Sequence, residues 1–156
     1  MAIRFKFFYG DLIDRFSKVK KLSTREIINY TLQGNCPEQE KYFIKLLHNR
    51  YWYSLSKNEL LDFLKGYDFH YLSDKAYHFI LLSCIKVFID IFKEDSTSLP
   101  EKMCFFLKDK SRALYADLEI RKLVKEFIQL LSYEPYNFLT FNIEDSDELM
   151  RIWTTK

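Results

Sequence analysis

Residues 74–94 read Asp-Lys-Ala-Tyr-His-Phe-Ile-Leu-Leu-Ser-Cys-Ile-Lys-Val-Phe-Ile-Asp-Ile-Phe-Lys-Glu, and this stretch decides the fold. Five polar residues recur near one line at helical spacing, namely Lys75, His78, Lys86, Asp90 and Lys93, whereas most of the remaining circumference is apolar. A helix that is apolar over most of its circumference must be covered by neighbours on several sides. Ser73 supplies an N-cap oxygen just before it. The stretch therefore predicts a buried central helix over about residues 74–94.

Composition places the rest of the chain around that helix in one mainly α domain. The 156 residues are 48% apolar and 29% charged, which is typical of a globular chain that builds one core. Three Gly and three Pro are too few for the many turns of a β-sandwich or barrel, or for a Gly-rich phosphate-binding loop. We therefore expect a single helical bundle over residues 1–156.

Local signals predict the helices that surround the central one. Capping-box pairs at Ser23/Glu26 and Ser56/Glu59 precede apolar residues at helical spacing, and Gly34 and Gly66 stand where those helices should end. Three further amphipathic helices are expected to begin near Pro37, Pro100 and Asp117.

The two ends of the chain carry short alternating patterns. Residues 4–7 alternate charged and aromatic side chains, and residues 139–143 alternate apolar with polar ones, as in half-buried strands. Short strands at the two ends are therefore expected, followed by a last half-buried turn over residues 147–153.

Cysteine use and targeting signals favour a cytoplasmic protein. Cys36, Cys84 and Cys104 are odd in number and show no paired spacing, unlike the disulfide framework of a small secreted domain. Arg4 and Lys6 interrupt the apolar residues at the N-terminus, so no export signal is expected. The most apolar stretch falls short of the roughly 20 residues that a bilayer span requires, so we expect no membrane association.

No pattern in the sequence predicts catalytic chemistry. The three His and three Cys have no spacing typical of a metal site, and neither a nucleophile motif nor a phosphate-binding motif is present. Cys84 lies among apolar residues, where a thiol behaves as a small hydrophobic group. We therefore expect no catalytic residue, metal ion or cofactor, and a small enzyme remains only the third hypothesis.

Charge is distributed unevenly along the chain, although the net charge is only +2. Residues 1–25 hold seven basic and two acidic side chains, a net of +5, with Phe and Tyr between them. Such a segment could contact phosphates and stack on bases, so a nucleic-acid-associated regulator is the second hypothesis. Residues 133–150 hold five acidic and no basic side chains, a net of −5.

The acidic end is the first candidate for a protein-binding surface. Its carboxylates lie among aromatic residues, a combination that would give a charged rim around an apolar anchor. An inhibitor of a basic, nucleic-acid-cleaving toxin would present such carboxylates to the toxin's active site. The candidate partner-binding residues are Tyr133, Glu134, Tyr136, Glu144, Asp145, Asp147, Glu148 and Trp153. The alternative surfaces are the turns at residues 51–53 and 68–71.

One stretch carries a resemblance to known proteins. Residues 66–82 read Gly-Tyr-Asp-Phe-His-Tyr-Leu-Ser-Asp-Lys-Ala-Tyr-His-Phe-Ile-Leu-Leu, in which a Leu-Ser cap and an Ala-Tyr pair lead into the long apolar helix. With Trp52 before it and the amphipathic residues 117–133 after it, this pattern resembles a family of small helical bacterial proteins. Those proteins in turn resemble immunity proteins of polymorphic or contact-dependent toxin systems. The resemblance covers about residues 50–133 and implies a non-enzymatic protein that binds and neutralises a cognate toxin.

Overall fold

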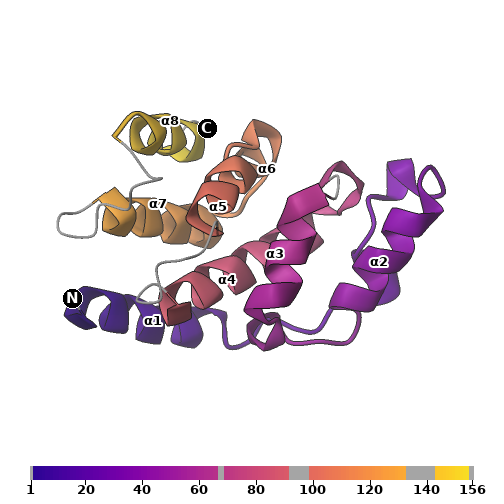
Figure 1. Cartoon of the computed structure of the whole chain (residues 1–156), viewed down its shortest axis with the longest axis horizontal. Coiled ribbons are helices and arrows are strands. Elements are labelled where there is room, and N and C mark those ends of the chain that lie inside the picture. Colours follow the sequence, from indigo (N-terminus) through magenta and orange to yellow (C-terminus); the bar gives the residue numbers. More distant parts are fainter. Residues whose placement is uncertain (1, 67–68, 92–98, 133–142, 155–156) are drawn as a thin grey trace. The chain divides into compact units, whose positions relative to one another are not determined.

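The computed structural model describes residues 2–66, 69–91, 99–132 and 143–154, and these residues are mainly α-helical (Figure 1). They contain eight α-helices and four 3-10 helices but no strand longer than an isolated bridge, which confirms the all-α fold class. The chain divides into two compact units. One comprises Lys18–Val87, and the other comprises Met1–Ser17 together with Phe88–Lys156. The expectation of a single domain over residues 1–156 stays a prediction.

The central stretch forms helix α4, Asp74–Ile91, and its predicted burial is confirmed. The Ser73 hydroxyl caps its start by accepting a hydrogen bond from the Ala76 amide at 3.0 Å. Most of its apolar residues are buried: Ala76, Tyr77, Phe79, Ile80, Leu81, Leu82, Cys84, Ile85, Val87, Phe88 and Ile89. Residues 92–94 of the predicted helix lie outside the described residues. In the described part of the chain, no helix is both long and apolar enough to cross a membrane.

The unit of residues 18–87 contains α4 as far as Val87 and a set of shorter helices. These are η1 (Thr24–Glu26), η2 (Tyr30–Leu32), α2 (Pro37–Leu47), η3 (Trp52–Ser54), α3 (Lys57–Gly66) and η4 (Phe69–Tyr71). The predicted starts of α2 and α3 are confirmed, because Pro37 occupies the first turn of α2 and Ser56 and Glu59 form a reciprocal cap. The buried Phe43 ring of α2 packs edge-on against Phe63 of α3, with ring centres 5.8 Å apart.

The helix predicted after Ser23 is wrong. Its capping box forms, but the chain makes only the 3-10 turns η1 and η2, and Gly34 follows with a φ of +90°. The backbone between these turns pairs across the unit instead. The Ser73 amide donates to the Ile27 carbonyl at 2.9 Å, and the Asn29 amide donates to the Tyr71 carbonyl at 2.7 Å. This pairing takes backbone groups that a continuous α-helix would have needed.

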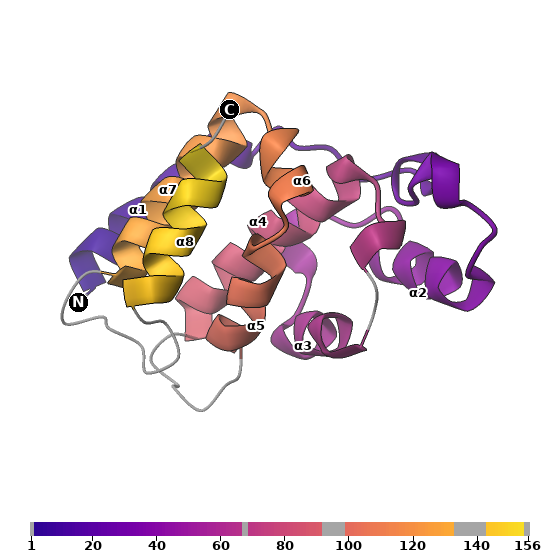
Figure 2. The ribbon, with the colours of Figure 1, turned by 90° about the horizontal axis from the view of Figure 1, so that it is seen from above.

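The second unit contains α1 (Ala2–Phe16), α5 (Leu99–Leu107), α6 (Lys110–Leu114), α7 (Leu118–Ser132) and α8 (Ile143–Thr154). Helix α7 lies between α1 and α8, and α8 also contacts α5 and α6 (Figures 1 and 2). The buried Phe127 ring of α7 packs against Phe8 of α1 at 6.0 Å and edge-on against Phe88 at 5.4 Å. The predicted cap of α7 is confirmed by the Ile120 amide, which donates to the Asp117 carboxylate at 2.9 Å.

The strand predicted at residues 4–7 is wrong, because these residues belong to α1. The buried residues Phe8, Leu12 and Phe16 recur every four positions, and this longer helical period overrides the short alternation before it. Residues 139–142 lie outside the described residues, and Ile143 begins α8. The predicted last turn is part of this twelve-residue helix.

Candidate protein-binding surfaces

The structure describes only part of the predicted acidic surface. Tyr133, Glu134 and Tyr136 lie outside the described residues. Glu144 and Asp145 belong to the first turn of α8, and Asp147, Glu148 and Trp153 follow in the same helix. The three residues whose side chains are described, Asp147, Glu148 and Trp153, have different environments.

Trp153 lies in the core of its unit and not at the surface. The side chain is 0% exposed, and its indole N–H donates to the Leu107 carbonyl at 2.9 Å. A buried indole with a satisfied N–H stabilises the contact between α8 and α5. Trp153 therefore cannot act as an exposed anchor for a partner while this unit is folded.

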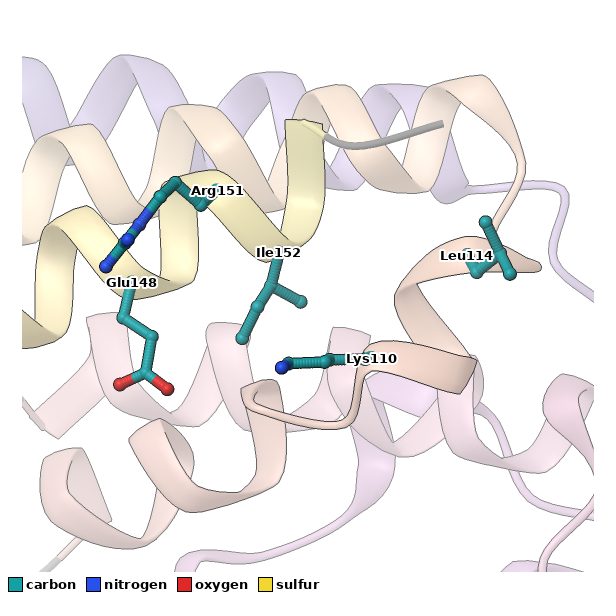
Figure 3. A pocket seen from close by; sticks show the side chains of 5 residues that line it. All are labelled: Lys110, Leu114, Glu148, Arg151 and Ile152. Carbon is teal, nitrogen blue, oxygen red and sulfur yellow. The ribbon is translucent and has the colours of Figure 1, made fainter.

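Cations accompany the carboxylates of α8. Asp147 is exposed, and the Glu148 carboxylate forms an ion pair with Lys108 at 3.2 Å. A pocket of about 540 Å³ is lined by Lys110, Leu114, Glu148, Arg151 and Ile152. Figure 3 shows Lys110 of α6 and Glu148 and Ile152 of α8 extending toward the same space. The described surface beside α8 is therefore mixed in charge, because basic residues of α6 and α8 lie next to the acidic ones.

The basic N-terminal segment, residues 1–25, is divided between the two units, because one unit ends at Ser17 and the other begins at Lys18. The guanidinium of Arg15 lies 2.8 Å from the Asp11 carboxylate and 3.0 Å from that of Glu126 on α7, so it helps to join α1 to α7. In the other unit, Lys18, Lys20 and Lys21 are exposed. Lys6 and Arg25 of this segment are exposed as well, whereas Arg15 is held in ion pairs with carboxylates.

An exposed pair of stacked tyrosines is the most distinctive surface feature of the unit of residues 18–87. The rings of Tyr51 and Tyr53 are nearly parallel, with an angle of 6° and centres 5.0 Å apart. They are 45% and 43% exposed, whereas Trp52 between them is 1% exposed. The Trp52 ring packs almost perpendicular to Tyr53, at 82° and 5.6 Å. The Tyr51–Tyr53 pair is therefore an aromatic surface attached directly to the core.

A cation from a distant part of the sequence covers Tyr51. The Lys21 ammonium lies 4.5 Å from the centre of the Tyr51 ring, a cation–π contact. The neighbouring backbone brings these residues together, because the Asn49 amide donates to the Leu22 carbonyl at 3.1 Å, next to a parallel bridge between Leu22 and His48. Asn49 has a φ of +56°, in the left-handed region that Asn tolerates better than most residues.

Hydrogen bonds fix the turn that carries the pair. The Ser54 hydroxyl and amide both donate to the Tyr51 carbonyl, at 2.8 and 3.0 Å. Arg50 donates to both carboxylate oxygens of Glu59, at 2.8 and 3.0 Å, and to the Ser54 carbonyl at 2.8 Å. The hydrogen bonds from Arg50 are the main cause that lowers the pKa of Glu59 below its usual value. This clamp joins the turn to the first turn of α3.

The Cys84 thiol and possible metal ligands were the candidates for catalytic chemistry. Cys84 is buried in α4, and this burial raises the pKa of its thiol, so the nucleophilic thiolate is disfavoured. Among the residues that the structure describes, no three His, Cys, Asp or Glu side chains are grouped so that they could hold a metal ion.

Sequence reasoning singled out the turn at residues 51–53 only as an alternative to the acidic end. Comparison with family models, with curated proteins and with solved structures finds no match for this chain. The class defined by the fold and the site is an all-helical protein with a preformed aromatic surface.

Proposed function

We propose that this chain is a non-enzymatic protein-binding protein of the cytoplasm, specifically an immunity protein that binds and neutralises a cognate bacterial toxin. The observation that carries the proposal is the Tyr51–Tyr53 pair, in which two half-exposed rings are held parallel on a hydrogen-bonded turn. Tyrosine is enriched at protein interfaces because its ring supplies a large contact area and its hydroxyl a polar contact.

The rigidity of the pair favours a role in binding. Ordering a mobile side chain at an interface costs about 0.5–1.5 kcal/mol of free energy, and a side chain that is already fixed avoids most of this cost. The clamp between Arg50 and Glu59, together with the Lys21 contact, fixes the turn before any partner arrives. The pair thus has the properties of a preorganised anchor, the kind of group that dominates binding energy at interfaces.

The resemblance supports the specific form of the proposal. The resembling segment, about residues 50–133, begins at the turn that bears the pair and includes the buried helix α4. The immunity proteins that it resembles act by stoichiometric binding of a toxin. A preformed contact surface on a stable helical scaffold suits this mode of action.

Co-expression tests the proposal. Each protein encoded beside this chain is produced in a bacterial host, alone and together with the chain, and growth is recorded. We expect one neighbour to inhibit growth, this chain to restore it, and the two to co-purify as a stoichiometric complex. If no encoded neighbour inhibits growth, or if an inhibitory neighbour is neither bound nor neutralised, the proposed function is wrong.

A matched pair of variants then tests the surface. Tyr51→Ala/Tyr53→Ala removes the stacked rings, whereas Tyr30→Ala removes a ring that is 87% exposed on η2 of the same unit. We expect the double variant to weaken the complex by at least tenfold, that is, by about 1.4 kcal/mol or more, while Tyr30→Ala has little effect. Equal effects of the two variants would show that the stacked pair is not a specific anchor.

A further inference from the structure

The unit that carries the Tyr51–Tyr53 pair has a basic excess. Residues 18–87 contain 11 Lys and Arg against 7 Asp and Glu, a net charge of +4, whereas the remaining residues have a net charge of −2. Lys21 lies over the Tyr51 ring, and Lys18 and Lys20 are exposed just before it in the chain. Cations thus accompany the aromatic pair.

Two carboxylates of this unit, Glu59 and Glu26, already have basic partners. Glu59 accepts both hydrogen bonds of the Arg50 fork. Glu26 forms an ion pair with Lys75 and also accepts a hydrogen bond from the Ser23 amide at 2.9 Å. The charges of Arg50 and Lys75 are thus balanced by carboxylates of the same unit. The Lys21 ammonium, in contrast, lies over the Tyr51 ring.

We infer that the Tyr51–Tyr53 pair and the adjacent lysines Lys20 and Lys21 form one docking surface for an acidic face of the partner protein. This inference rests on the proposed function and specifies the chemistry of its partner. The rings would supply the apolar contact, and the lysines would attract carboxylates at the rim of the interface. The partner therefore presents Asp or Glu side chains around an apolar recess that receives the tyrosines.

A nucleic acid is the competing polyanion, and the geometry of the rings favours a protein. Aromatic residues that bind single strands need a ring face on which a base can stack. Tyr51 stacks on Tyr53 and carries the Lys21 ammonium over its ring, and Trp52 packs against Tyr53. The faces that Tyr51 and Tyr53 turn toward each other are thus engaged within the chain, and Lys21 lies over the Tyr51 ring, which suits insertion of the pair as one block into a protein surface.

Charge reversal at two lysines and one control tests the inference. Lys21→Glu reverses a charge and removes the cation–π contact, whereas Lys20→Glu reverses a charge and leaves that contact in place. Lys41→Glu on α2 changes the net charge equally at another exposed position. Association of each variant with the growth-inhibitory neighbour is measured at about 50 mM and about 500 mM salt, a range over which screening strengthens greatly.

We expect Lys20→Glu and Lys21→Glu each to associate about tenfold more slowly than Lys41→Glu at low salt, with the difference shrinking at high salt. If the wild type binds the neighbour but all three variants behave alike, the inference is wrong and the proposed function stands. If no complex forms with the wild type, both fall. Salt-dependent retention of the wild type on single-stranded DNA or RNA, lost in Lys20→Glu, would assign the surface to nucleic acid and overturn the inference.

Discussion

Phe127 allows a quantitative test of the packing between α1, α4 and α7. Its ring is fully buried and touches the rings of Phe8 and Phe88. Phe127→Ala leaves a cavity and removes both ring contacts, and truncation of a buried Phe typically costs about 3–5 kcal/mol. Because both aromatic contacts are lost together, we expect a loss of unfolding free energy near the upper end, at about 4 kcal/mol.

Urea unfolding followed by far-ultraviolet circular dichroism measures this loss, and Phe105→Ala provides the control. Phe105 is in the same unit but is 81% exposed, so the same chemical change there should alter the stability by no more than about 0.5 kcal/mol. A double-mutant cycle with Phe88→Ala should give a coupling energy of about 0.5–1.5 kcal/mol, typical of an aromatic pair in contact.

The result that would refute this reasoning is a small or non-specific effect. A loss below about 1 kcal/mol for Phe127→Ala is less than any fully buried Phe should show, and it would mean that the ring is not packed as described. An equal loss for Phe105→Ala would show that the effect depends on the Phe side chain generally and not on its burial.

Three further predictions concern charge and thiol chemistry. The hydrogen bond from Lys75 lowers the pKa of Glu26 to about 2, so its stabilising effect should be present above pH 4.5 and lost as the pH falls toward 2. Glu26→Gln should remove this acid dependence and cost no more than about 1 kcal/mol at neutral pH, as measured by unfolding at several pH values. A native-state thiol assay should modify the partly exposed Cys36 first and Cys84 only after unfolding; fast labelling of Cys84 would contradict its burial. Replacing Glu144, Asp145, Asp147 and Glu148 by Lys should not slow the association of an acidic partner that docks on the Tyr51–Tyr53 pair, whereas clearly slower association at low salt would make α8 the interface.

The helices that local signals could predict are those whose starts depend on neighbouring residues. The Ser73 and Asp117 caps, the Pro37 turn and the Ser56/Glu59 pair all use contacts within a few positions along the chain. The failure at Ser23 shows the limit of such signals. There the same capping box forms, but the backbone pairing with residues 71–73 stops the helix, and no local pattern encodes a partner more than about forty residues away.

The candidate site shows the same limit. The turn at residues 51–53 was an alternative contact surface on sequence grounds, but the approach of Lys21 depends on the pairing of Leu22 with residues 48 and 49. The acidic end was predicted from carboxylates and aromatic residues that are near each other in sequence, and that pattern could not reveal that Lys108 pairs with Glu148 or that Trp153 is buried. The net charge of a segment does not show which of its charged side chains form ion pairs in the fold, whereas attraction of a partner depends on the charges that the surface presents.

Trp52 connects the buried helix α4, which the sequence predicts, with the Tyr51–Tyr53 pair, whose geometry it does not. The Ser83 hydroxyl of α4 donates to the Trp52 carbonyl, and the buried Trp52 ring packs against the exposed Tyr53. Ser83 faces the core because it lies among the buried residues of α4, and the Phe79 carbonyl, 3.0 Å from its hydroxyl oxygen, is a second acceptor within reach of the same hydrogen. The buried helix α4 thus holds the turn through the Ser83 hydrogen bond. The Lys21 contact with Tyr51 and the hydrogen bonds between Arg50 and Glu59 hold it further. The same contacts therefore stabilise the unit and orient the rings, which is the support that a preorganised binding site would need.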